Sequence, residues 1–180
     1  PSRKVSGVEA LLRWMHPQRG LLMPEHFIVV AEESGLLLRL GEWICRTACQ
    51  HAQVWREQGW PELQLTINLS PRQFLDTHLT TCLETTLQQT RLPPEALELD
   101  LSERITLYDE TQVLARLRAL KQLGVNLALD DFGAGYSALS YLKRRFPLDT
   151  VKIDRSFMRE IPQSAVSQTL ATAMIQLAHS

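Results

Sequence analysis

The sequence predicts an α/β fold built around a parallel sheet. Short apolar runs alternate with longer helical patterns, a strand-then-helix unit recurs five times, and no linker or low-complexity segment divides the 180 residues. Parallel strands need helical crossovers between them, so a repeated strand-then-helix order is the pattern expected of such a sheet. We therefore interpret residues 1–180 as a single domain.

The predicted strands are apolar runs bounded by turn residues, at 5–14, 63–70, 97–102, 126–131 and 150–154. The first run would equally suit a helix, because its core reads Glu-Ala-Leu-Leu. The predicted helices cover 24–35, 36–58, 72–90, 109–123, 137–145 and 164–179. Their ends carry the expected residues: Pro24 opens the first, Ser70 and Pro71 open the third, and Gly35 and Gly124 each end one.

Two architectures suit five such units. One is a five-stranded, doubly wound open sheet, which is complete at this size. The other is a (β/α)₈ barrel, which typically needs about 250 residues and eight strands. On length alone the open sheet is favoured.

Composition narrows the class of protein. The formal net charge of -1 gives no field that would attract a nucleic acid polymer or an anionic membrane, so an anionic ligand must be held by a local site.

The three cysteines give no disulfide framework and fit a reducing compartment. Cys45 and Cys49, with His51 nearby, could bind a metal, but buried thiols on an apolar helix face are the commoner case. No apolar run reaches membrane-spanning length, and the cytoplasm is the default location.

Polar side chains mark the carboxyl end of every predicted strand. Both architectures place their chemistry at these ends, which are brought together at one edge of the sheet. In chain order they are Glu9 and Arg13, Asn68, Asp100 or Glu103, Asp130 and Asp131, and Lys152 and Asp154. Each alone could be a turn or cap residue, but acids or amides at all five ends favour a shared site.

Several carboxylates at one point require a cation to stay ionised. Oxygen ligands suit Mg²⁺, Mn²⁺ or Ca²⁺ better than zinc. Two metals sharing a carboxylate would hold a phosphodiester and deprotonate a water, while Lys152 and Arg13 would supply positive charge for the phosphate oxygens. The strand ends therefore predict metal-dependent phosphoryl chemistry.

The same residues carry a family resemblance. In order, the segments VEALLRW, TINLSPRQF, LELDLSE, LALDDFGAGYSALSYLKR and DTVKIDRSF are similar to the motifs of the EAL domain family, the bacterial cyclic-di-GMP phosphodiesterases. The resemblance covers nearly the whole chain from residue 8. It implies a TIM-like barrel, of which this chain holds about five β/α units, and so reverses the preference drawn from length. It further implies a homodimer and hydrolysis of cyclic-di-GMP to linear pGpG with Mg²⁺ or Mn²⁺, with Ca²⁺ as an ion that can bind and inhibit.

Roles follow position by position from the resemblance. The implied metal ligands, in a two-metal site, are Glu9, Asn68, Asp100, Asp130 and Asp131. Glu9, Asp131 and Lys152 are the implied catalytic residues, with Lys152 beside the attacking water. Leu11, Arg13 and Asp154 are implied substrate contacts, and Glu103 is expected to steady the loop after the paired aspartates.

The chain departs from the family pattern in three places. Asp100 stands where the family usually has the longer Glu, which could displace a metal far enough to cost rate. One extra residue precedes Lys152, in a helix-to-strand connection where insertions are tolerated. The family's first strand and its later AEGVE strand have no counterpart in these 180 residues, so we expect a fragment that is inactive alone.

Two other functions remain open. A degenerate domain of this family would bind cyclic-di-GMP as a receptor without turnover, and Asp100 favours that interpretation. A purely structural role is the third option, in which the apolar segment MPEHFIVVAEESGLLLRL serves as an interaction surface. Family members often carry sensor or GGDEF domains beside this one, so a parent protein could be membrane-anchored elsewhere.

Overall fold

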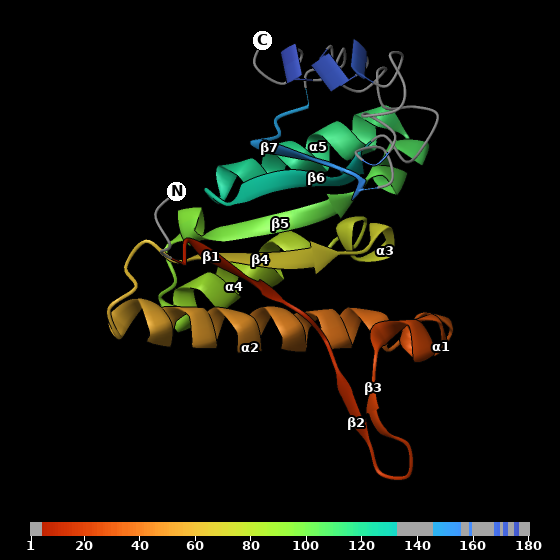
Figure 1. The fold of residues 1–180 in the computed structure, drawn as a ribbon, viewed down its shortest axis with the longest axis vertical. Coiled ribbons are helices and arrows are strands. Elements are labelled where there is room, and N and C mark those ends of the chain that lie inside the picture. Colours follow the sequence, from red (N-terminus) through yellow and green to blue (C-terminus); the bar gives the residue numbers. More distant parts are fainter. Residues whose placement is uncertain are drawn as a thin grey trace.

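The computed structural model describes residues 5–132 and 146–155, with isolated positions at 159, 168–169, 171–172 and 175–176. Within these residues one sheet has the strand order β1-β4-β5-β6-β7, and every neighbouring pair is parallel (Figure 1). Its strands are β1 (Gly7–Ala10), β4 (Gln64–Leu69), β5 (Leu97–Ser102), β6 (Asn126–Phe132) and β7 (Thr150–Ile153). The order follows the chain without reversal, whereas a doubly wound sheet reverses at its switch point. The fold is therefore an incomplete TIM-like barrel, and the doubly wound alternative is wrong.

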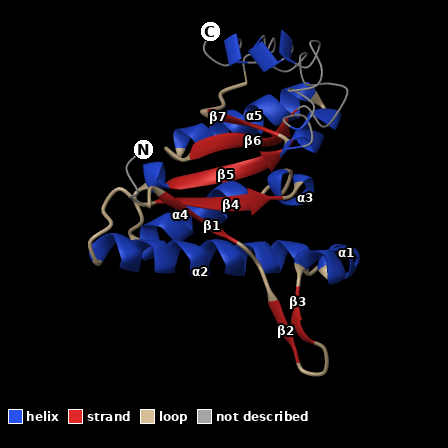
Figure 2. Ribbon diagram, viewed as in Figure 1, coloured by secondary structure: helices blue, strands red, loops and turns tan. Residues whose placement is uncertain are grey.

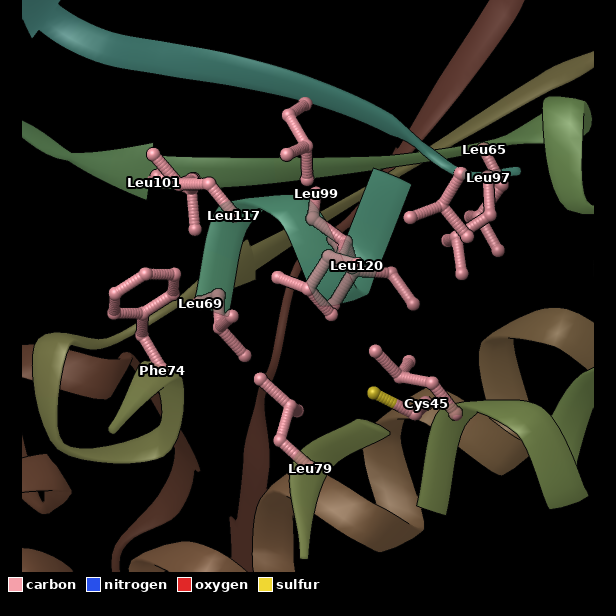
Figure 3. Packing of buried hydrophobic residues seen from close by; sticks show 14 of the residues in the cluster. Cys45, Leu65, Leu69, Phe74, Leu79, Leu97, Leu99, Leu101, Leu117 and Leu120 are labelled. Atoms are coloured by element: carbon pink, nitrogen blue, oxygen red, sulfur yellow. The ribbon is translucent and has the colours of Figure 1, made fainter. Parts of the chain in front are cut away.

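In the described ranges the helices that follow the strands pack on one face of the sheet. They are α2 (Leu37–Glu57), α3 (Pro71–Phe74), α4 (Leu79–Thr90) and α5 (Glu110–Gln122), and Figure 2 shows α4 and α5 behind the red strands. Leucines from β5, α4 and α5 meet in the core, together with Phe74 of α3 (Figure 3). A barrel has this layout, because its helices form the outer layer and its other sheet face becomes the interior.

Side chains alternate between the two sheet faces along β4 and β5. On β4 and β5 the buried, helix-facing residues are Leu65, Ile67, Leu69, Leu97, Leu99 and Leu101. The residues between them face the opposite side, as the two-residue period of a strand requires. That second face, which we call the inner face, carries the polar side chains of the sheet.

Several helix ends form as the sequence predicts. Ser70 and Gln73 make a complete capping box at the start of α3. Asp109 caps α5 by accepting a hydrogen bond from the Gln112 N–H at 3.0 Å. Gly124 follows α5 with a φ of +88°, a left-handed conformation that favours glycine.

Two predicted elements are subdivided. The strand predicted over 5–14 ends at Ala10, and Trp14–His16 forms β2, which pairs with β3 (Gly20–Leu22) in a separate hairpin. Arg13 therefore lies between strands and not on one. The first predicted helix begins as a short 3₁₀ turn, η1 (Pro24–His26), and continues as α1 (Ile28–Glu33).

The helix predicted over 72–90 is broken between α3 and α4. Asp76 Oδ1 accepts a hydrogen bond from the His78 N–H at 3.1 Å, a local turn that competes with helix. The 3₁₀ turns η2 (Pro94–Ala96) and η3 (Glu103–Leu107) flank β5. The helix predicted at 137–145 lies outside the described residues, and 164–179 is described only at isolated helical positions.

The thiols Cys45 and Cys49 are buried on the core side of α2, as the packing interpretation predicts. Among the residues described, no helix is long and apolar enough to cross a bilayer.

Candidate active site

The inner face gathers the polar side chains of all five strands. Register places Asn68 of β4 beside Asp100 of β5, and Ser102 beside Asp130 of β6. The side chains on this face include Glu9, Thr66, Asn68, Glu98, Asp100, Ser102, Asp130, Thr150 and Lys152. The parallel sheet thus unites residues from its first strand to its last, which lie far apart in the chain.

Glu9 and Asn68 are in direct contact across β1 and β4. Asn68 Nδ2 donates a hydrogen bond to Glu9 Oε1 at 2.7 Å. The amide nitrogen of Asn68 thus donates to Glu9. The side-chain carbonyl oxygen of Asn68 is the atom that could bind a cation. These two predicted ligands do lie together.

Asp100 is the most buried carboxylate of the inner face, with 4% of its side chain exposed. Its Oδ2 accepts a hydrogen bond from Lys152 Nζ at 2.6 Å. Its Oδ1 is buried and has no hydrogen-bond partner in the described part of the chain. Burial raises the pKa of Asp100; Lys152 opposes this shift, and the charges of Asp130 and Glu98 add to it.

Lys152 lies between two carboxylates. Its Nζ is 2.6 Å from Asp100 Oδ2 and 3.0 Å from Glu98 Oε1. Burial lowers the pKa of Lys152, but the hydrogen bonds and charges of Asp100 and Glu98 outweigh it, and the net shift is upward. At neutral pH the side chain is therefore an ammonium group that donates hydrogen bonds and does not act as a base.

A pocket of about 390 Å³ opens beside these residues. Asn68, Asp100 and Asp130 line the pocket, and so do Leu11 and Arg13. Leu11 is an exposed apolar side chain. Arg13 is exposed and donates a hydrogen bond to the Leu12 carbonyl oxygen at 2.6 Å. The pocket lining thus combines two carboxylates and an amide with apolar side chains and a guanidinium group.

Other predicted residues lie near the same edge of the sheet. Glu103 begins η3 directly after β5 and is half-buried. Asp154 directly follows β7, where its N–H donates to the Phe132 carbonyl oxygen at 3.0 Å. Asp131 belongs to β6, but its side chain is outside the described part of the structure, so its role stays a prediction.

Glu98 is an inner-face carboxylate that sequence reasoning misses, together with Thr66 and Thr150 that contact it. It lies in the middle of its strand, whereas the predicted site is confined to the residues at strand ends. A signal is available in the sequence: Glu98 precedes Asp100 by two residues, and residues two apart on a strand share a face.

The oxygen atoms of the inner face are the atoms that would bind the predicted divalent cation. Among the described side chains there is no group of three or more His, Cys, Asp and Glu residues placed to hold a metal ion. The oxygen donors nevertheless fit a hard divalent cation in kind, because the buried, unpartnered Oδ1 of Asp100 lacks a compensating interaction that a cation would supply.

The sequence model of the EAL domain matches the chain over residues 1–180. The chain belongs to the EAL domain family. Two similar proteins are the bifunctional diguanylate cyclase/cyclic di-GMP phosphodiesterase MucR of Pseudomonas aeruginosa and the cyclic di-GMP phosphodiesterase PdeR of Escherichia coli, at 37% and 38% identity. Each match covers 98% of this chain and 26% of the relative, so the EAL chain spans about a quarter of these proteins.

Solved structures agree with the fold. The MucR phosphodiesterase in complex with c-di-GMP superimposes with a TM-score of 0.86 at 37% identity, over 97% of this EAL chain and 70% of that chain. The EAL enzyme Bd1971, in a form bound to cAMP and cyclic-di-GMP, also gives 0.86, at 32% identity over 99% of this chain and 49% of that one. Their fold matches the parallel sheet described above.

Proposed function

We propose that this EAL domain belongs to a phosphodiesterase that cleaves one phosphodiester bond of cyclic-di-GMP, giving linear pGpG by in-line attack of water. The observation that carries the proposal is the buried carboxylate of Asp100, with one oxygen on the Lys152 ammonium and the other without a partner among the described residues, beside a pocket lined by Asn68 and Asp130. The phosphodiesterases MucR and PdeR support the substrate class.

The residues that would hold Mg²⁺ or Mn²⁺ are oxygen donors of the inner face: Glu9, Asn68, Asp100 and Asp130, together with Asp131. Bound divalent cations supply a lowered pKa for water and charge stabilisation for the phosphate. The Asn68–Glu9 hydrogen bond fixes the amide so that its carbonyl oxygen is free to bind.

Lys152 has a separate task in this proposal. As an ammonium group it orients the attacking water or donates to a phosphate oxygen, and the carboxylates of Asp100 and Glu98 hold it in place. Arg13 and Leu11, which line the pocket, would contact the phosphate and the body of the ligand, with Asp154 as a further substrate contact.

The test uses the full-length protein with cyclic-di-GMP and either Mg²⁺ or Mn²⁺. We expect pGpG from the wild type and a loss of about 100-fold or more in kcat for Lys152→Met, since a charge aimed at the transition state is removed. Lys121→Met is the matched control, because Lys121 also pairs with a carboxylate, Asp149, at 2.7 Å but lies away from the pocket. A folded wild type that forms no pGpG with either metal would disprove the proposal.

A receptor without turnover is the second candidate. It is favoured by Asp100 itself, which is shorter than the family's usual Glu and already engages Lys152 through one oxygen. Calorimetry separates the two: tight binding of cyclic-di-GMP with no product identifies a receptor. In the enzyme, replacing Mg²⁺ with Ca²⁺ should retain binding and abolish turnover.

The oligomeric state and the cellular location of the protein are also proposals. We propose a homodimer, which light scattering of the full-length protein checks, and a cytoplasmic location beside sensor or GGDEF domains. The expectation that residues 1–180 alone are inactive is checked by the same pGpG assay.

A further inference from the structure

We propose that Glu98 is a positioning residue, which fixes the Lys152 ammonium beside Asp100. The inference deepens the proposed function and rests on it for the catalytic consequence. Glu98 lies on β5, two residues before Asp100, with its side chain 19% exposed on the inner face.

The Glu98 carboxylate binds three donors from two other strands. Its Oε1 accepts from Thr66 Oγ1 of β4 at 3.3 Å and lies 3.0 Å from Lys152 Nζ. Its Oε2 accepts from Thr150 Oγ1 of β7 at 3.3 Å. The Lys152 ammonium therefore shares Oε1 with the Thr66 hydroxyl group, whereas the Thr150 hydroxyl group contacts only the other oxygen.

This contact has to cross β6, because β5 and β7 are not neighbours in the sheet. Ala128 is the residue of β6 at the crossing, in register with Asp100 on one side and Thr150 on the other. Its methyl group is fully buried and small. Lys152 and Thr150 can therefore reach over β6 to the acids of β5.

A lysine side chain has many rotamers, and fixing one of them costs conformational entropy. Asp100 alone could hold Nζ at one oxygen, but the group could still turn about that contact. Glu98 supplies the second anchor, which fixes the position.

A merely structural role for Glu98 would be to tie β4, β5 and β7 together. Glu98→Gln separates the two roles, because the amide keeps the shape and an oxygen that can accept from a hydroxyl group but loses the charge that holds the ammonium. Thr150→Val is the matched control, since it removes one strand-tying hydrogen bond and leaves both carboxylates in place. Glu98→Asp keeps the charge at shorter reach.

The first measurement needs no turnover. Without divalent metal, the acetylation rate of each lysine in the full-length protein is followed by mass spectrometry, with Lys121 as internal reference. We expect the Lys152 rate to rise about threefold or more in Glu98→Gln, to rise less in Glu98→Asp, and to stay close to wild type in Thr150→Val. An unchanged Lys152 rate in Glu98→Gln overturns the proposal.

The second measurement is kinetic. We expect Glu98→Gln to lower kcat about 10- to 100-fold with KM within about twofold and Tm unchanged, because a misplaced group slows the chemical step. A loss of kcat that follows a loss of Tm, and that Thr150→Val reproduces, would mean a structural role and overturn the proposal. If the wild type makes no pGpG but Lys152 acetylation still depends on Glu98, the phosphodiesterase proposal fails, and the contact remains without that catalytic role.

Discussion

Asp100 and Lys152 show how burial and pairing set the charge of single residues in this molecule. Burial raises the pKa of the Asp100 carboxyl, while the ion pair with Lys152 works in the opposite direction. Lys152 remains protonated because two acids surround it. The charge state of each residue therefore depends on neighbours from other strands and not on its own type alone.

The core thiols lead to a prediction at the same scale. Burial raises the pKa of Cys45 and of Cys49 from 9.0 to about 12, with smaller contributions from the neighbouring thiols. A thiol that ionises at lower pH in the unfolded chain favours unfolding once the pH exceeds the unfolded value. This contribution to stability is thus complete below about pH 9 and is lost as the pH rises towards 12.

Urea unfolding at about pH 8 and about pH 10, on either side of the ordinary thiol pKa, measures this effect. We expect a lower midpoint at the higher pH, and a smaller difference between the two pH values in a Cys45→Ala/Cys49→Ala variant. Iodoacetamide at the lower pH should modify Cys82, which is only half-buried, before the other two. Equal alkylation rates for all three thiols in the folded protein would contradict this account.

At the scale of elements, α2 and α3 are joined by a close contact. A Cβ at Gly41 of α2 would come 2.0 Å from the Gln73 side-chain nitrogen of α3. The Gln73 side-chain oxygen in turn accepts from the Ser70 N–H at 3.0 Å and from Ser70 Oγ at 2.7 Å. The absence of a side chain at Gly41 thus leaves room for the Gln73 amide in the capping box of α3.

Gly41→Ala should displace the Gln73 amide and disrupt the capping box. The loss of about 1 kcal/mol offsets the gain of up to about 1 kcal/mol that alanine brings to a helix interior. In a Gln73→Ala background the clash is absent, and the same substitution should stabilise the protein. A double-mutant cycle by urea unfolding should give a coupling energy of about 1 kcal/mol, and additive effects would contradict the contact.

The elements also show where sequence reasoning succeeds. β5 and β6 are predictable nearly to the residue, because leucines recur at every second position in both and turn residues bound them. The β2–β3 hairpin escapes prediction: its strands are three residues each and lie beside a Pro/Gly stretch, so no periodicity develops. The break after α3 is equally hidden, because it depends on one side-chain hydrogen bond to Asp76.

At the scale of the whole molecule, one core supports the sheet from its helical side. Leu99 is fully buried at the centre of β5, and Leu99→Ala should lower the free energy of unfolding by about 2–5 kcal/mol. Leu107→Ala is the matched control, since that side chain is 78% exposed and its loss should change stability by no more than about 0.5 kcal/mol. Similar effects of the two substitutions on urea midpoints would contradict the assigned core.

The site is predictable in outline from the same overall plan. Parallel strands bring their carboxyl ends together, which unites Glu9 with Asn68 and places Asp100 beside Lys152. The positions of the strand ends do not predict a site residue in the middle of a strand, such as Glu98. Glu98 acts across β6 only because Ala128 is small, and that depends on the register of three strands, which no single segment reveals.

The alternation of side chains along β4 and β5 has a consequence for how this protein can evolve. The helix-facing residues of these strands should determine how much folded protein accumulates. The inner-face residues should determine its activity. In a saturation library scored separately for abundance and for activity, β4 should show two interleaved profiles, with abundance sensitive at the buried Leu65, Ile67 and Leu69 and activity sensitive at Asn68. Substitutions on the inner face could then change the activity of the protein while leaving the stability of the fold almost unchanged.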